Sequence, residues 1–122
     1  MPKILVAADA AWVRDQVRLA FVGPGQEVIE VTRGQDVRSA VADHDPDLVV
    51  LDMQIGNMGG VAAAIDLRLE ESGGRLDRAN ILLLLDRESD AFIARRADVD
   101  RMLVKPVDAG TLRRAARDLL PA

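Results

Sequence analysis

The sequence contains no cysteine and no tyrosine, and its aromatic residues are limited to one tryptophan and two phenylalanines. The absence of cysteine excludes disulfides, thiolate metal sites and cysteine nucleophiles, and it suits a reducing compartment. The scarcity of aromatic side chains excludes a platform on which nucleic-acid bases could stack.

The chain also lacks an excess of basic charge and any long hydrophobic run. It has 20 acidic and 16 basic residues, and only Lys3 and Lys105 are lysines. This balance gives no basic surface of the kind that neutralises phosphates along a nucleic acid, so we expect no direct nucleic-acid binding. The apolar stretch at residues 4–8 is too short for a signal peptide or a membrane span. We therefore expect a cytoplasmic protein that does not contact membranes.

Short apolar runs alternate with segments whose apolar residues recur at helical spacing, and 122 residues suffice for one domain, residues 1–122. The apolar runs predict strands at residues 4–7, 27–31, 48–51, 81–85 and 102–104. The remaining segments predict a helix that follows Asp9, helices at residues 34–43, 60–71 and 91–97, and a final helix capped near Asp108.

Five such units predict an α/β fold of the flavodoxin-like, doubly wound (βα)5 type, with a five-stranded parallel sheet in the order 2-1-3-4-5. Helical spacing also predicts which residues face the sheet. In the helix at residues 60–71 these are Val61, Ala64, Ile65 and Leu69, and in the final helix they are Leu112, Ala115, Ala116 and Leu119.

Polar residues follow three of the predicted strands: Asp9, Asp52 and Lys105. In this strand order the carboxyl ends of strands one, three and five surround one crevice, so two carboxylates and one ammonium are expected to converge. A carboxylate pair favours a hard cation such as Mg²⁺, which keeps several waters and takes phosphate oxygens as ligands. Asp52 could then attack phosphorus to form an aspartyl phosphate, and Lys105 could pair with a phosphate oxygen.

Three motifs in their order along the chain resemble the landmarks of response-regulator receiver domains: Leu48-Val49-Val50-Leu51-Asp52, Met58-Gly59-Gly60 and Leu103-Val104-Lys105-Pro106. The resemblance covers essentially the whole chain. It implies that Asp52 is the phosphoacceptor and that Lys105 contacts the phosphate. It implies that Asp9, Asp52 and the backbone carbonyl of Gln54 bind Mg²⁺ weakly, and that the Lys105-Pro106 bond is cis. It also implies that a histidine kinase or phosphotransfer protein donates the phosphate from a phosphohistidine.

The sequence departs from the receiver pattern at four places. Ala8 stands where a second acid usually ends strand one, and Gly56 replaces the usual loop proline. The Ser or Thr that normally closes strand four is replaced by either Leu85 or Asp86, and the aromatic residue of strand five is replaced by Met102. These departures identify an atypical member of the family.

Several alternatives stay open at the level of sequence. Asp9 could be a helix N-cap as readily as a metal ligand, and Asp86 is more typical of a polar loop than of catalysis. The favoured function is a stand-alone receiver domain that signals through a downstream protein partner. Formation of a homodimer is compatible with this function. We expect no enzyme activity beyond its own phosphorylation and dephosphorylation. The alternative is a pseudo-receiver that binds partners without phosphorylation. A flavodoxin-fold cofactor binder is a weaker option.

Overall fold

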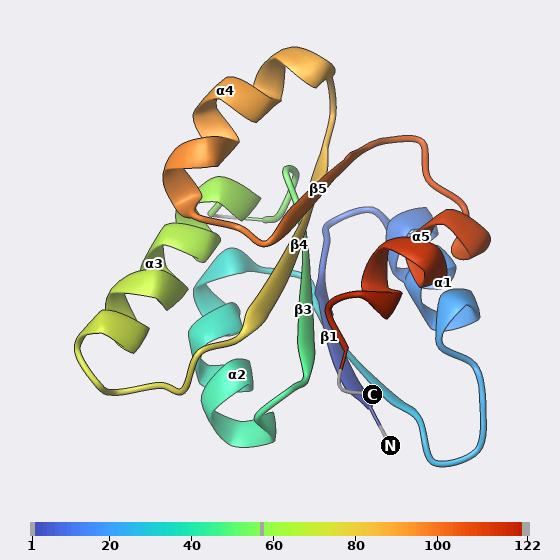
Figure 1. Ribbon diagram of the computed structural model, residues 1–122, viewed down its shortest axis with the longest axis horizontal. Coiled ribbons are helices and arrows are strands. Elements are labelled where there is room, and N and C mark those ends of the chain that lie inside the picture. The colour runs from blue at the N-terminus through green and yellow to red at the C-terminus, as the bar shows by residue number, and fades with distance from the viewer. Residues whose placement is uncertain (1, 57, 121–122) are drawn as a thin grey trace.

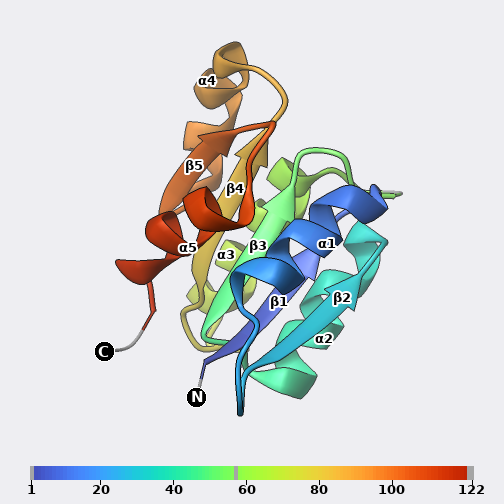
Figure 2. The same cartoon turned by 90° about the vertical axis from the view of Figure 1, so that its right-hand side faces the viewer.

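Five short strands form one parallel sheet in the order β2-β1-β3-β4-β5, which confirms the predicted fold class (Figures 1 and 2). The computed structural model describes residues 2–56 and 58–120, so Asn57 of the loop expected after Asp52 lies outside the described residues. The strands are β1 (Lys3–Ala7), β2 (Glu27–Val31), β3 (Leu48–Asp52), β4 (Asn80–Leu85) and β5 (Arg101–Val104).

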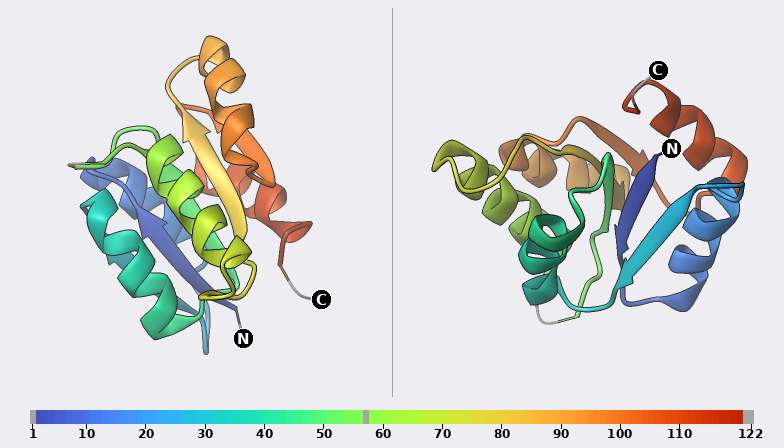
Figure 3. Two further views of the ribbon diagram at one scale, coloured as in Figure 1. Left: turned by 90° about the vertical axis from the view of Figure 1, so that its left-hand side faces the viewer. Right: turned by 90° about the horizontal axis from the view of Figure 1, so that it is seen from below.

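Helices cover both faces of this sheet. Figures 1 and 3 show α2, α3 and α4 on one face and α1 and α5 on the other. The helices are α1 (Ala11–Ala20), α2 (Val37–His44), α3 (Gly60–Ser72), α4 (Ala91–Ala94) and α5 (Ala109–Arg117). Short 3₁₀ turns precede α2 (Gly34–Asp36) and flank α4 (Glu88–Asp90 and Arg95–Ala97). In the described part of the chain, no helix is both long and apolar enough to cross a membrane.

The alternation of side chains along each strand divides the core into two layers. The layer under α2, α3 and α4 includes Leu5, Val49, Leu51, Ile81 and Leu83. The layer under α1 and α5 takes the intervening residues, which include Ile4, Val6, Val50, Leu82 and Leu84. All five residues of β3 are buried, as expected for a central parallel strand that is covered on both faces.

The face that α3 turns toward the sheet differs from the predicted one. Ala64 is buried and Val61 is partly buried against the core, as expected, but Ile65 is 38% exposed and Leu69 is 60% exposed. The buried residues are instead Gly60, Ala63, Ala64, Leu67 and Glu70. The prediction was wrong for Ile65 and Leu69 because apolar residues surround most of this helix, so their spacing does not select one face. Packing against the sheet made the selection.

The N-cap and the inner face of α5 agree with the prediction from the sequence. Asp108 is the N-cap, and its carboxylate accepts a hydrogen bond from the backbone N–H of Thr111 at 2.7 Å. Leu112, Ala115 and Ala116 are buried as predicted. Leu119 follows the helix and is partly buried against the same core layer. The predicted cap and inner face of this helix are thus confirmed.

Candidate functional site

Asp52 is the last residue of β3, and its side chain is completely buried. One carboxylate oxygen, Oδ1, accepts a short hydrogen bond from the Lys105 ammonium. The other oxygen, Oδ2, is buried and has no hydrogen-bond partner among the described residues. A buried carboxylate oxygen without a partner is costly in a folded protein, and such a group calls for a functional explanation.

Gly60 is the first residue of α3, and it lets the helix begin directly against the backbone of Asp52. A Cβ atom at position 60 would lie 2.2 Å from the backbone carbonyl oxygen of Asp52. No side chain larger than hydrogen fits at this distance without a shift of the backbone. The Met58-Gly59-Gly60 motif therefore fixes the approach of α3 to the end of β3.

Lys105 follows β5 and reaches across to the end of β3. Its backbone N–H donates to the carbonyl of Leu85 at 2.8 Å, and the Lys105-Pro106 peptide bond is cis, which confirms the prediction. Its side chain is only 11% exposed, and Nζ lies between two carboxylates. The first is Asp52, as expected. The second is Asp86, whose Oδ1 lies 2.8 Å from Nζ.

The structure shows that the side chain of Asp86, rather than that of Leu85, contacts the Lys105 ammonium. Leu85 ends β4 and is buried in the core layer under α3 and α4, so its side chain is not available to the site. Asp86 instead binds Lys105 through Oδ1 and accepts a hydrogen bond from Gln54 Nε2 to Oδ2 at 2.8 Å. Asp86 thus lies in the segment that follows β4, as expected, and it also contacts Lys105, which the sequence did not predict.

One signal in the sequence could have identified Asp86. It directly follows the fourth apolar strand, and the same criterion selected Asp9, Asp52 and Lys105. The register of the folded sheet explains why this criterion applies to Asp86: Asp52 pairs with Leu84, and Leu84 pairs with Leu103. Side chains two positions apart along a strand point to the same face of the sheet. Asp86 lies two positions beyond Leu84, and Lys105 lies two positions beyond Leu103, so both point to the face of these two leucines.

The pKa values of the three charged groups reflect this crowded arrangement. Burial raises the pKa of Asp52, and the hydrogen bond and charge of Lys105 oppose this only in part. Burial by itself would lower the pKa of Lys105, but the two carboxylates together outweigh it and raise the pKa. The hydrogen bond from Gln54, followed by that from Lys105, lowers the pKa of Asp86. Lys105 is therefore a firmly protonated cation.

Asp9 is exposed and stands apart from the hydrogen bonds around Lys105. It is not a helix cap, because α1 begins at Ala11, the N-cap residue is Ala10, and the cap receives no side-chain hydrogen bond. The backbone N–H of Asp9 donates to the carbonyl of Gln54 at 3.0 Å. The backbone thus places Asp9 beside the carbonyl that was expected to bind Mg²⁺.

The donor atoms around Asp52 are compatible with a weakly held hard cation. Asp52 offers the unpaired Oδ2, and the Gln54 carbonyl keeps a second lone pair after accepting the Asp9 amide. Within residues 2–56 and 58–120, however, no three acidic or histidine side chains gather closely enough to hold a metal by themselves. A cation here would keep much of its water shell, as Mg²⁺ commonly does.

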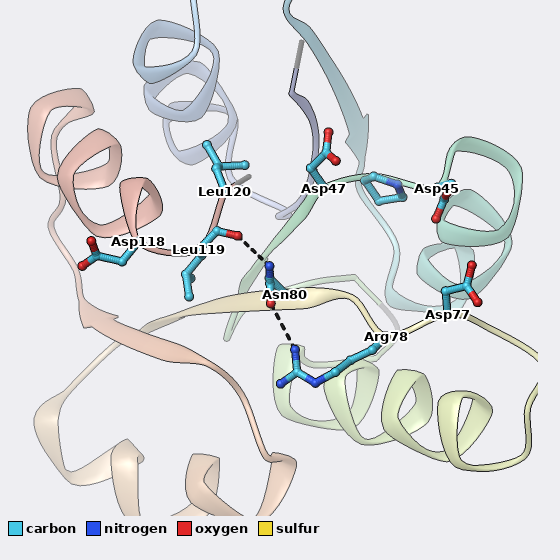
Figure 4. Close-up of a pocket in the computed structure, with 9 residues that line it drawn as sticks. Asp45, Asp47, Asp77, Arg78, Asn80, Asp118, Leu119 and Leu120 are labelled. Atoms are coloured by element: carbon cyan, nitrogen blue, oxygen red, sulfur yellow. Dashed lines mark hydrogen bonds between the residues drawn. The ribbon is translucent and has the colours of Figure 1, made fainter. Parts of the chain in front are cut away.

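Figure 4 shows a different pocket, at the amino ends of the strands and thus opposite the Asp52 site. This cavity of about 510 Å³ is lined by residues that precede β3 and β4 and that follow α5. Within it, Asn80 Nδ2 donates to the carbonyl of Leu119 at 2.6 Å, and Arg78 donates to Asn80 Oδ1 at 3.0 Å. The first of these contacts joins the segment after α5 to β4. The pocket contains none of the predicted site residues.

Comparison with known proteins agrees with the fold. Residues 4–117 match the family of response regulator receiver domains. This match spans most of the chain, and the chain therefore belongs to this family. Receiver domains are signalling domains, and as a class they depend on Mg²⁺.

Individual relatives support the same assignment. The aerobic respiration control protein ArcA of Escherichia coli K12 is 27% identical over 123 residues, which cover 98% of this chain and 48% of ArcA. The chemotaxis protein CheY of Bacillus subtilis is 27% identical over 108 residues, which cover 88% of each chain. The chain thus spans about half the length of ArcA and most of the length of CheY.

Solved structures show the same fold at lower identity. The chemotaxis protein CheY4 of Vibrio cholerae has a TM-score of 0.84 at 20% identity, with 98% of this chain and 99% of that chain covered. The BeF3-activated receiver domain of Klebsiella pneumoniae RstA has a TM-score of 0.82 at 21% identity, with the same coverage. These likenesses concern the fold, while the site is described by its own contacts.

Proposed function

We propose that this receiver domain accepts a phosphoryl group on Asp52 and signals through protein–protein contacts. The observation that carries the proposal is the buried Asp52 carboxylate, which has one oxygen on the Lys105 ammonium and the other without a partner among the described residues. An unpaired oxygen beside a fixed cation is suited to attack on phosphorus, because the cation neutralises charge on the transferred group.

The transfer requires few groups from the protein. The bond between Asp52 Oδ2 and phosphorus forms while the P–N bond of a donor phosphohistidine breaks. The imidazole nitrogen leaves with the bonding electron pair and takes up a proton. Lys105 Nζ, already held beside Asp52, donates a hydrogen bond to an equatorial oxygen of the phosphoryl group. Position and charge neutralisation supply most of the catalysis in such transfers.

A Mg²⁺ ion would be held by Asp9, Asp52 and the backbone carbonyl of Gln54, and it would neutralise further charge on the phosphoryl oxygens. Of these residues, Asp52 is buried, whereas Asp9 and Gln54 are exposed to solvent. We expect the affinity to be weak, because two carboxylates and a carbonyl bring little negative charge.

Receiver domains receive their phosphate from histidine kinases or phosphotransfer proteins, and we propose a partner of this class for this chain. The acidic balance of 20 to 16 residues favours a protein rather than a nucleic acid as the downstream partner. The residues that contact this partner would change environment when Asp52 is phosphorylated.

Mass spectrometry of the intact protein tests the proposal. Incubation with acetyl phosphate and Mg²⁺ should add one phosphoryl group to the wild type and none to Asp52→Asn. The exposed carboxylate of Asp43 provides a matched control, and Asp43→Asn should be labelled like the wild type. If saturating donor and Mg²⁺ leave the wild type unmodified, the protein works as a pseudo-receiver, without phosphorylation.

A further inference from the structure

Asp86 places a second negative charge at the point where a phosphoryl group on Asp52 would be bound. Both of its carboxylate oxygens are engaged by groups of the site: Oδ1 by Lys105 Nζ and Oδ2 by Gln54 Nε2, each at 2.8 Å. The side chain is therefore held over the site, although it is 34% exposed.

Lys105 is shared between two anions before any phosphate arrives. Its ammonium has three N–H donors, and the structure directs it toward Asp52 Oδ1 and Asp86 Oδ1. With both acids ionised, the three side chains together carry one net negative charge. An incoming phosphoryl group is itself anionic, so it must compete with Asp86 for Lys105 and approach against the Asp86 charge.

We propose that Asp86 is an internal competitor for Lys105 that slows phosphorylation of Asp52. This inference rests on the proposed phosphoacceptor function and names a residue that regulates it. Asp86 forms no bond to phosphorus in this scheme. With acetyl phosphate as donor, the Asp52 Oδ2–phosphorus bond forms, the bond from phosphorus to the acetyl oxygen breaks, and acetate leaves with the electron pair. Asp86 acts only on the charge and position of Lys105.

The experiment compares labelling rates with acetyl phosphate and Mg²⁺ by mass spectrometry of the intact protein. Asp86→Asn removes the charge at nearly constant shape, and Asp86→Ser provides a second variant should the first fail to fold. Glu88→Gln is the matched control, because Glu88 is an exposed acid in the same loop. We expect Asp86→Asn to be labelled about tenfold faster than the wild type, since a like charge at contact range and partial exposure changes a rate by roughly this factor. Glu88→Gln should stay within about twofold of the wild type, because water and salt screen the charge of an exposed side chain.

Ionic strength distinguishes a charge effect from a merely structural one. Salt screens repulsion at a partly exposed carboxylate, so the ratio of the Asp86→Asn rate to the wild-type rate should fall as NaCl is raised from 0.01 M toward 1 M. A change in packing alone would leave this ratio constant, and that result would refute the proposed mechanism.

The remaining outcomes separate this proposal from the function on which it rests. Labelling of the wild type and Asp86→Asn at equal rates, or slower labelling of Asp86→Asn, overturns the role of Asp86 but leaves Asp52 as phosphoacceptor. Labelling of Asp86→Asn alone supports a blocking role of Asp86 and, because the wild type then accepts no phosphate, refutes the phosphoacceptor function of the wild type. If no variant is labelled, both the phosphoacceptor function and the competitor role are refuted.

Discussion

Replacing Lys105 with methionine would leave the Asp52 carboxylate buried without its cation. The Asp52 side chain is 0% exposed and that of Lys105 is 11% exposed, so little water can replace the lost ammonium. Removing one partner of a buried ion pair costs about 3–5 kcal/mol. The free energy of unfolding of a domain is about 5–15 kcal/mol, so we expect Lys105→Met to lose a large part of it and to melt at least ~10 °C lower at pH 7.

The loss should depend on pH with a definite sign. Burial already raises the pKa of Asp52, and removal of Lys105 raises it further. A carboxyl group with a higher pKa in the folded state binds more protons when folded, so the free energy of unfolding falls as pH rises between the unfolded and folded pKa values. The loss caused by Lys105→Met should therefore be smaller at pH 5 than at pH 7.

Urea unfolding at pH 7 and pH 5 measures these losses. Lys105→Met/Asp52→Asn should recover most of the stability, since it removes the buried charge along with its partner. The exposed Arg96 supplies a control, because Arg96→Met removes a surface cation and should change the free energy of unfolding by less than about 0.5 kcal/mol. The reasoning fails if Lys105→Met loses under about 1 kcal/mol at pH 7, loses equally at both pH values, or is no less stable than the double variant.

Three further changes test other parts of the structure. Gly60→Ala should destabilise the protein by about 1–3 kcal/mol in urea, because the new Cβ would lie 2.2 Å from the Asp52 carbonyl oxygen; an unchanged midpoint would contradict this packing. Asp108→Ala should lower the melting temperature at pH 7 and have less effect near pH 3. The hydrogen bond from Thr111 lowers the pKa of Asp108, so its stabilisation is present above the unfolded-state pKa and is lost as pH falls. Asp9→Ala should abolish Mg²⁺ binding in an NMR titration, and an unchanged affinity would remove Asp9 from the metal site.

The arrangement of strands and helices could be predicted largely from local patterns. The strand at residues 27–31 has the predicted bounds, and β3 extends the predicted strand by one residue, Asp52. The fold class followed because short buried strands and amphipathic helices differ in the period of their apolar residues, and this period is written in the sequence itself. The cap at Asp108 is also a local interaction, with Thr111 three residues later.

Local patterns failed where they were compatible with two structures. The apolar residues of α3 surround most of the helix, so its spacing did not show that Leu67 would be buried and Leu69 exposed. Asp9 has the right residue type for an N-cap, but α1 begins one residue too late for it to serve as one. In both cases the packing of a helix on the sheet selected one of two locally acceptable conformations.

The sequence by itself determined the fold class and the placement of Asp52 and Lys105 at the ends of strands. Only the tertiary structure decided that Asp86 joins them. Lys105 lies 53 positions from Asp52 in the chain, and Gln54 lies 32 positions from Asp86. Contacts across such separations depend on the register of β3, β4 and β5 and on the face to which each side chain points. A shift of one residue in this register would turn the carboxylate to the other face, so its role is a property of the assembled sheet.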